Sequence, residues 1–277
     1  MKKMILSTGL ALGALTCSYG ADAQETDSLP AGNDSIRFTY PVQKSQLPAW
    51  QTKQFHTTIA GVAVPVAMIS YGVFALNNPT LRDLNSTTKA EIKEDHPQFR
   101  THIDNYLQYA PVTAVYILNA AGIQGKHNLR DRSIILGISA VITAGTVEIV
   151  KNRTHEERPD HSDYLSFPSG HTATAFAAAE FLRQEYKDVS PWYGVAGYLA
   201  ATTTGALRMY NNKHWLSDVV AGAGIGILGT KAAYWMYPWI QRQLFKDPAH
   251  PATKMIMPYY NPQFHSAGLS FIFFPAK

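Results

Sequence analysis

Residues 151–171, with the sequence KNRTHEERPDHSDYLSFPSGH, form the polar joint on which the predicted fold depends. An uncharged segment, Ser133–Val147, precedes this joint, and an alanine-rich segment, His171–Leu182, follows it. Apolar segments of this length bounded by polar residues are typical of helices. The stretch therefore predicts two helices joined by a loop, with charged and polar residues at the helix boundaries.

Two clusters inside the joint carry groups suited to an anion. Lys151 closes the first helix, and Arg158 precedes Pro159, which disfavours helix there. Ser169 is a good N-cap for the second helix, whose free N–H groups beside Gly170 can face an anion. Each cluster alone is explained as well by cations complementing a helix C-terminus or by ordinary capping.

A third cluster, residues 208–218, has the sequence RMYNNKHWLSD. His214 and Asp218 stand four residues apart and so share one helix face. A carboxylate on one ring nitrogen fixes the tautomer and leaves the other nitrogen free to attack, although a structural His–Asp pair has the same spacing. Arg208 offers a planar fork for phosphate oxygens.

Together the three clusters indicate phosphoryl transfer. The set contains three cations, neutral donors at a helix N-terminus, and two histidines, one of them with an aspartate behind it. Positive donors stabilise the phosphoryl oxygens as charge spreads in the transition state. We expect His214 to attack phosphorus and His171 to protonate the leaving alkoxide and then activate water, with no metal and no cofactor.

The spacing K-x6-R-P, then P-S-G-H, then R-x5-H-x3-D resembles the type 2 phosphatidic acid phosphatase superfamily, which includes lipid phosphatases, class A acid phosphatases and vanadium haloperoxidases. The resemblance runs from about Asn105 to Pro238. It implies an all-α fold, a six-helix bundle with the site at one end. One departure is Leu207, where the family usually has serine before the arginine of its third motif.

The resemblance also implies a role for each motif residue. It makes His214 the nucleophile, His171 the acid and Asp218 the residue that orients His214. The phosphate-binding residues that it implies are Lys151, Arg158, Ser169, Gly170 and Arg208.

The rest of the chain is consistent with a helical protein. Charged residues make up 16% of the 277 residues, and hydrophobic residues make up 46%, which excludes a disordered chain. A polar segment, Asn77–His102, is expected to be a loop or a surface helix. The six expected helices lie in Thr57–Leu76, Asn105–Gly125, Ser133–Val147, His171–Leu182, Val189–Leu207 and Val219–Thr230.

The two ends of the chain differ from this helical domain, which we place at residues 51–246. Residues 1–23 have the pattern of a signal peptide: two lysines, a short apolar run and an Ala-x-Ala site at Ala21–Ala23. Residues 24–50 are a polar lead-in. In the tail, residues 247–277, Lys254–Pro258 and Ser266–Phe274 are expected to form a β-hairpin.

A signal peptide and a formal charge of +4 together favour a periplasmic enzyme that works at a membrane surface or partly inserted in it. Cleavage would remove Cys17, the single cysteine, and with it any disulfide or thiolate metal site. Three segments approach the length of about 20 residues that spans a bilayer: Thr57–Leu76, Asn105–Gly125 and Val189–Leu207. The charge is too diffuse to indicate nucleic-acid binding.

Several substrates fit this description. A lipid-linked phosphate is the leading expectation, and lipid A is the first choice within that class. Undecaprenyl diphosphate and phosphatidylglycerophosphate are close alternatives. A soluble acid phosphatase of broad specificity is another, and a non-catalytic envelope protein is disfavoured by the intact motifs.

Overall fold

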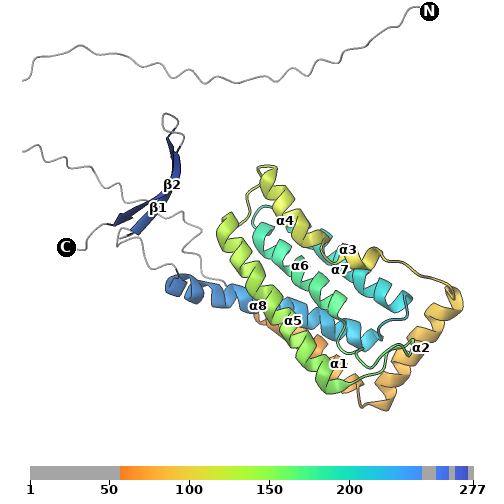
Figure 1. Cartoon of the computed structure of the whole chain (residues 1–277). Helices are drawn as coiled ribbons and strands as arrows, with labels where there is room; N and C mark the ends of the chain where they lie inside the picture. Colours follow the sequence, from red (N-terminus) through yellow and green to blue (C-terminus); the bar gives the residue numbers. More distant parts are fainter. Residues whose placement is uncertain (1–56, 245–253, 262–265, 274–277) are drawn as a thin grey trace, which may run out of the picture. The chain divides into compact units, whose positions relative to one another are not determined.

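The computed structural model describes residues 57–244, 254–261 and 266–273 (Figure 1). The expected signal peptide and polar lead-in lie outside these residues. In chain order the elements are α1 (Ile59–Ala75), α2 (Pro79–Asp95), α3 (Ile103–Leu107), α4 (Ala110–Ala120), α5 (Leu129–Thr154), α6 (Gly170–Tyr186), α7 (Pro191–Tyr210), α8 (Leu216–Leu244), β1 (Lys254–Asn261) and β2 (Ser266–Phe273).

The expected all-α class is confirmed, and all six expected helices are present. The described residues hold two more, α2 and α3. The segment left open as a loop or a surface helix is the helix α2, with Asn85 as its one buried residue. The segment Asn105–Gly125 is broken, because α3 ends at Leu107 and α4 begins at Ala110.

The tail contains the expected hairpin. Strands β1 and β2 pair antiparallel, with Lys254 opposite Phe273 and Asn261 opposite Ser266. The first strand continues past Pro258 to Asn261, so it is longer than expected.

Side-chain caps set the starts of four helices. Thr58, Asn78, Asn128 and Ser190 each accept a hydrogen bond from a backbone N–H in the first turn of the following helix. Such a cap satisfies a donor that the helix itself cannot pair. The short polar joints between apolar segments therefore act as helix start signals.

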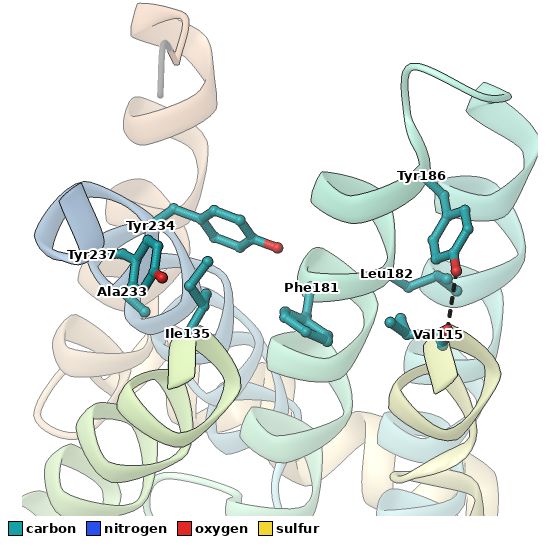
Figure 2. Close-up of a cluster of buried hydrophobic side chains, with 8 residues drawn as sticks. All are labelled: Val115, Ile135, Phe181, Leu182, Tyr186, Ala233, Tyr234 and Tyr237. Atoms are coloured by element: carbon teal, nitrogen blue, oxygen red, sulfur yellow. Dashed lines mark hydrogen bonds between the residues drawn. The ribbon is translucent and has the colours of Figure 1, made fainter. Parts of the chain in front are cut away.

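Helix α6 is central to the packing and contacts α3, α4, α5, α7 and α8. Figure 2 shows the cluster that joins its second half to its neighbours, including Val115 from α4, Ile135 from α5, Phe181 from α6 and Tyr234 from α8. Tyr186 at the end of α6 donates a hydrogen bond of 3.0 Å from its hydroxyl to the Val115 carbonyl. This cluster fixes the second half of α6, and the first turn of α6 carries the motif residues Gly170 and His171.

Two glycines let α8 approach the backbone of α6. A Cβ atom on Gly222 would lie 2.6 Å from the Ser169 carbonyl oxygen, and one on Gly226 would lie 2.2 Å from the Ala173 carbonyl oxygen. Only glycine permits approach this close. The start of α6 and the start of α8 are therefore held together by direct backbone packing.

Two described helices are long and apolar enough to cross a membrane, Leu129–Thr154 and Leu216–Gln241, or up to three if the pair α1 and α2, bent by 94°, forms one span. Two of the three segments that approach the spanning length are not among these candidates: Asn105–Gly125 is broken and leaves only the 11-residue helix α4, and Val189–Leu207 lies in α7. Helix α5 presents exposed apolar side chains, such as Val141 and Ile149. This face suits contact with lipid.

Candidate active site

The eight residues singled out from the sequence lie at helix ends or in adjoining loops. Lys151 is in the last turn of α5, and Arg208 is in the last turn of α7. Ser169 is the N-cap residue of α6, and Gly170 and His171 open that helix. Arg158 lies in the loop between α5 and α6, His214 precedes α8, and Asp218 is in its first turn.

Contacts within the cluster show that the structure brings these residues together. The Arg158 Nη1 and His214 Nε2 atoms are 3.5 Å apart. The Ser169 backbone N–H donates to the Asp218 carbonyl oxygen at 3.0 Å, which joins the start of α6 to the start of α8. A Cβ atom on Gly170 would lie 4.0 Å from the Lys151 Cε atom.

His214 and Asp218 form a buried pair. The His214 Nδ1 atom is 3.5 Å from Asp218 Oδ2, and the two side chains are 2% and 0% exposed. Asp218 Oδ2 also accepts hydrogen bonds from Ser166 Oγ at 2.5 Å and from the Trp215 backbone N–H at 2.9 Å. His214 Nδ1 has no hydrogen-bond partner among the described residues. The carboxylate is therefore fixed behind the ring, and a small shift would close this contact.

Each of the three cations has a partner that holds it in place. Lys151 Nζ donates to the Leu165 carbonyl oxygen at 2.7 Å. Arg158 Nε donates to Asp163 at 2.7 Å, and Arg208 Nη1 donates to Asp104 at 2.6 Å. Positive charge is thus held in position beside both histidines, as preorganised electrostatic stabilisation requires.

His171 contacts Asn105 of α3, with 2.8 Å between His171 Nε2 and Asn105 Oδ1. The pKa of His171 is lowered to about 4, first by burial and then by the positive charge of Arg208. The pKa of His214 also lies well below its usual value, because the ring is buried among the same cations. Both imidazoles are therefore neutral at pH 7 in this structure.

Helix α2 braces the loops that carry the site. Asn85 donates to Ser217 Oγ at 2.9 Å and accepts from the Ser217 backbone N–H at 3.1 Å, next to Asp218. Lys89 donates to the Pro159 carbonyl oxygen at 2.6 Å, and its ammonium lies 5.2 Å from the centre of the Trp215 ring. The loop after α5 and the start of α8 are thereby tied to one helix.

The acidic and histidine-rich loop between the first two motifs pairs mostly with basic groups. His161 contacts Glu157, and Lys213 contacts Asp160. No group of three or more His, Cys, Asp or Glu side chains that could hold a metal ion is found in the described part of the chain.

The sequence did not predict the residues whose side chains form hydrogen bonds with the motif residues and so position them. Asp104 and Asn105 are adjacent in α3, yet they contact Arg208 and His171 respectively. Ser166 and Asp163 lie inside the polar joint, but nothing in their spacing marks them as partners of Asp218 and Arg158. The position of Asp104 and Asn105 at the start of the uncharged segment Asn105–Gly125, directly after the polar segment Asn77–His102, is the one signal that could have drawn attention to α3.

Comparison with known proteins gives both a sequence relative and structural neighbours. A lipid A 1-phosphatase of Porphyromonas gingivalis is 40% identical over 151 residues, which are 54% of this chain and 33% of that protein. The chain thus spans about a third of the length of this curated relative.

Two solved structures show limited similarity to this chain, and each alignment covers most of the solved chain. Aquifex aeolicus LpxE has a TM-score of 0.40 and 20% identity, over 52% of this chain and 92% of that one. A transmembrane PAP2 type phosphatidylglycerolphosphate phosphatase of Bacillus subtilis has a TM-score of 0.39 and 16% identity, over 66% of this chain and 98% of that one.

A family match covers the candidate site itself. Residues 132–242 match the PAP2 superfamily, and this region contains all eight residues singled out from the motifs. The candidate site therefore lies in a region of the chain that is similar to the PAP2 superfamily.

Proposed function

We propose that this protein is a phosphatase that removes phosphate from a lipid-linked phosphomonoester through a phosphohistidine intermediate, without a metal or cofactor. The observation that carries the proposal is the gathering of three cations and two neutral histidines at one site, with Asp218 held behind His214. The match of residues 132–242 to the PAP2 superfamily supports the same activity.

In the proposed first step His214 attacks phosphorus with Nε2, the ring nitrogen that lies near Arg158. Asp218, behind Nδ1, fixes the tautomer and stabilises the imidazolium that forms. The Nε2–P bond forms as the bond from phosphorus to the leaving oxygen breaks. The three cations and the first-turn N–H groups of α6 bind the phosphoryl oxygens as charge spreads over them.

His171 supplies the proton for the leaving alkoxide. With a pKa of about 4 it is neutral in the free site. A phosphate dianion offsets the positive charges that depress this pKa, so the imidazole gains its proton as the substrate binds. In the second step neutral His171 takes a proton from water, the water oxygen attacks phosphorus, and the Nε2–P bond breaks.

Exposed apolar side chains beside the site support a lipid substrate. On α3, Ile103 is 61% exposed and Tyr106 is 79% exposed, and they flank the residues that contact Arg208 and His171. Tyr164, 61% exposed, precedes the residue whose carbonyl holds Lys151. Clusters of exposed apolar groups beside a charged site suit a ligand with a charged head and hydrocarbon chains.

Lipid A is the substrate that we propose, at the periplasmic face of a bacterial envelope. The 40% identity to a protein named as a lipid A 1-phosphatase supports lipid A. The signal pattern at residues 1–23 supports the periplasmic side, and the two candidate spanning helices support membrane association. Undecaprenyl diphosphate and phosphatidylglycerophosphate are the competing lipid substrates.

The test measures phosphate release by the full chain, purified in detergent, from each of these three lipids and from a soluble phosphomonoester. We expect the highest kcat/KM with lipid A. His214→Ala should lose the activity, while His161→Ala, whose side chain is 71% exposed, should keep it. Mass spectrometry of lipid A from a deletion strain should show added phosphate. An unchanged phosphate count would exclude lipid A as the substrate.

A further inference from the structure

A second charged cavity lies away from the catalytic end of α6. Its volume is about 440 Å³, and it is bordered by the first turns of α1 and by side chains of α6, α7 and α8. Glu180 on its wall is ten residues after Gly170, which corresponds to about 15 Å along the helix. This cavity is therefore separate from the candidate active site.

The cavity wall contains more positive than negative groups. Glu180 is fully buried and accepts from Arg183 at 2.9 and 2.8 Å and from Lys231 at 2.8 Å. Gln184 and Tyr198 also donate to Glu180, so both carboxylate oxygens are in use. Among the residues that line the cavity, two cations thus share one carboxylate.

The ammonium of Lys231, a residue of α8, lies beside the N-terminus of α1, which is the end of a helix that repels a cation. A Cβ atom on Gly61, in the first turn of α1, would lie 3.6 Å from Lys231 Nζ. That turn contains no acidic residue, and a helix N-terminus carries partial positive charge. Lys231 is also only 3% exposed, so water screens it little. An anion in the cavity would relieve this excess of positive charge.

An apolar pocket of about 420 Å³ adjoins the cavity and shares Arg183, Lys187 and Tyr198 with it. Its wall includes Val195 and Leu199, which are 44% and 65% exposed. A positively charged cavity next to an apolar pocket fits a ligand with an anionic head and a hydrocarbon chain.

We propose that this pair of pockets binds an anionic phospholipid. The phosphodiester lies near Lys231, Arg183 and the first turn of α1, and an acyl chain lies along the apolar pocket beside Leu199. This proposal does not depend on the proposed catalytic function, because the phospholipid binds beside the second half of α6, whereas the candidate active site lies at its first turn.

The test measures thermal unfolding of the full chain in detergent micelles that contain phosphatidylglycerol, phosphatidylcholine or neither. A lipid that binds the folded state at ten times its Kd should raise Tm by about 3–6 °C. We expect this shift with phosphatidylglycerol and little with phosphatidylcholine. Glycerophosphoglycerol, the same headgroup without acyl chains, should give less than half of it.

Variants of one face of α1 separate this site from others. Ala60 is exposed and borders the cavity, so Ala60→Trp should fill it and abolish the phosphatidylglycerol shift without touching the Glu180 cluster. Ala63→Trp, also exposed but not on the cavity wall, should keep the shift. Lys231→Met should reduce it, and phosphatase activity should stay as in the wild type in both tryptophan variants.

Three results would overturn the proposal. One is an equal phosphatidylglycerol shift in Ala60→Trp and Ala63→Trp. Another is an equal shift with phosphatidylcholine and phosphatidylglycerol in the wild type. The third is a full shift with glycerophosphoglycerol that Ala60→Trp abolishes, which would identify a site for a soluble anion instead of a lipid.

Discussion

Replacing Asn105 with aspartate changes the charge that faces His171 with little change in side-chain size. Asn105 Oδ1 lies 2.8 Å from His171 Nε2, so Asn105→Asp places a carboxylate oxygen at hydrogen-bond distance from the ring. A carboxylate favours the imidazolium and opposes the cations that depress the pKa of His171. The variant should therefore raise the pKa of His171.

The size of the effect follows from the distance and from the starting pKa of about 4. An opposite charge in contact shifts a pKa by about 1–3 units, which brings His171 to about 5–7. At pH 6 the protonated fraction would rise from about 1% to about 10–90%. The pH above which kcat/KM falls should move upward by the same amount, because kcat/KM reports groups of the free enzyme.

Histidine ring NMR signals followed against pH measure this pKa directly, and loss of one signal in His171→Gln assigns it. Asn105→Ala is the control, because it removes the acceptor without adding charge and should leave the pKa low. If Asn105→Asp folds with a normal Tm but the pKa of His171 moves by less than about 0.5 unit, the assigned contact is wrong.

Four further predictions concern the site and its support. Asp218→Asn should lower kcat by about 10³–10⁴-fold, because the ring of His214 loses its orienting carboxylate; a loss below tenfold would contradict the role given to Asp218. Asp104→Ala should lower the free energy of unfolding by about 3–5 kcal/mol, because it leaves buried Arg208 unpaired, and denaturant titration would show this loss. Gly226→Ala should cost about 1–3 kcal/mol by forcing α8 from α6, whereas Gly145→Ala, with open space at its Cβ position, should change stability by less than about 1 kcal/mol. Orthovanadate should inhibit phosphate release by occupying the cation site, and a chelator should leave the rate unchanged.

The motif residues could be predicted from sequence because each sits at a helix boundary with a local signal. Ser169 precedes an alanine-rich helix, and Pro159 disfavours the helical conformation at Arg158. Such signals act over a few residues, so they are visible in one chain. The gathering of the motifs was inferred from the chemistry of the combined set, and the contacts between Arg158, His214 and Asp218 agree with it.

The supporting residues could not be predicted, because their partners are distant in sequence. Asp104 and Arg208 are separated by 104 positions, and Asn105 and His171 by 66. No periodicity or capping rule links such positions. Asn85 could not be predicted for the same reason, because its hydrogen bonds to Ser217 join residues 132 positions apart.

The sequence underestimates the length of a helix where a charge follows an apolar segment. The predicted helix Val219–Thr230 stops before Lys231, yet α8 continues to Leu244. Lys231 stays inside the helix because Glu180 neutralises it. A buried charge with a partner from another element does not end a helix.

The pairing of Arg208 with Asp104 leaves only part of this cation's charge for phosphate. Asp104 accepts from the guanidinium at Nη1, whereas Nε has no hydrogen-bond partner among the described residues. In the proposed mechanism Arg208 binds phosphate while Asp104 stays in place and partly offsets its charge. The product is then held less tightly than three unpaired cations would hold it, so we expect short residence of inorganic phosphate and weak product inhibition.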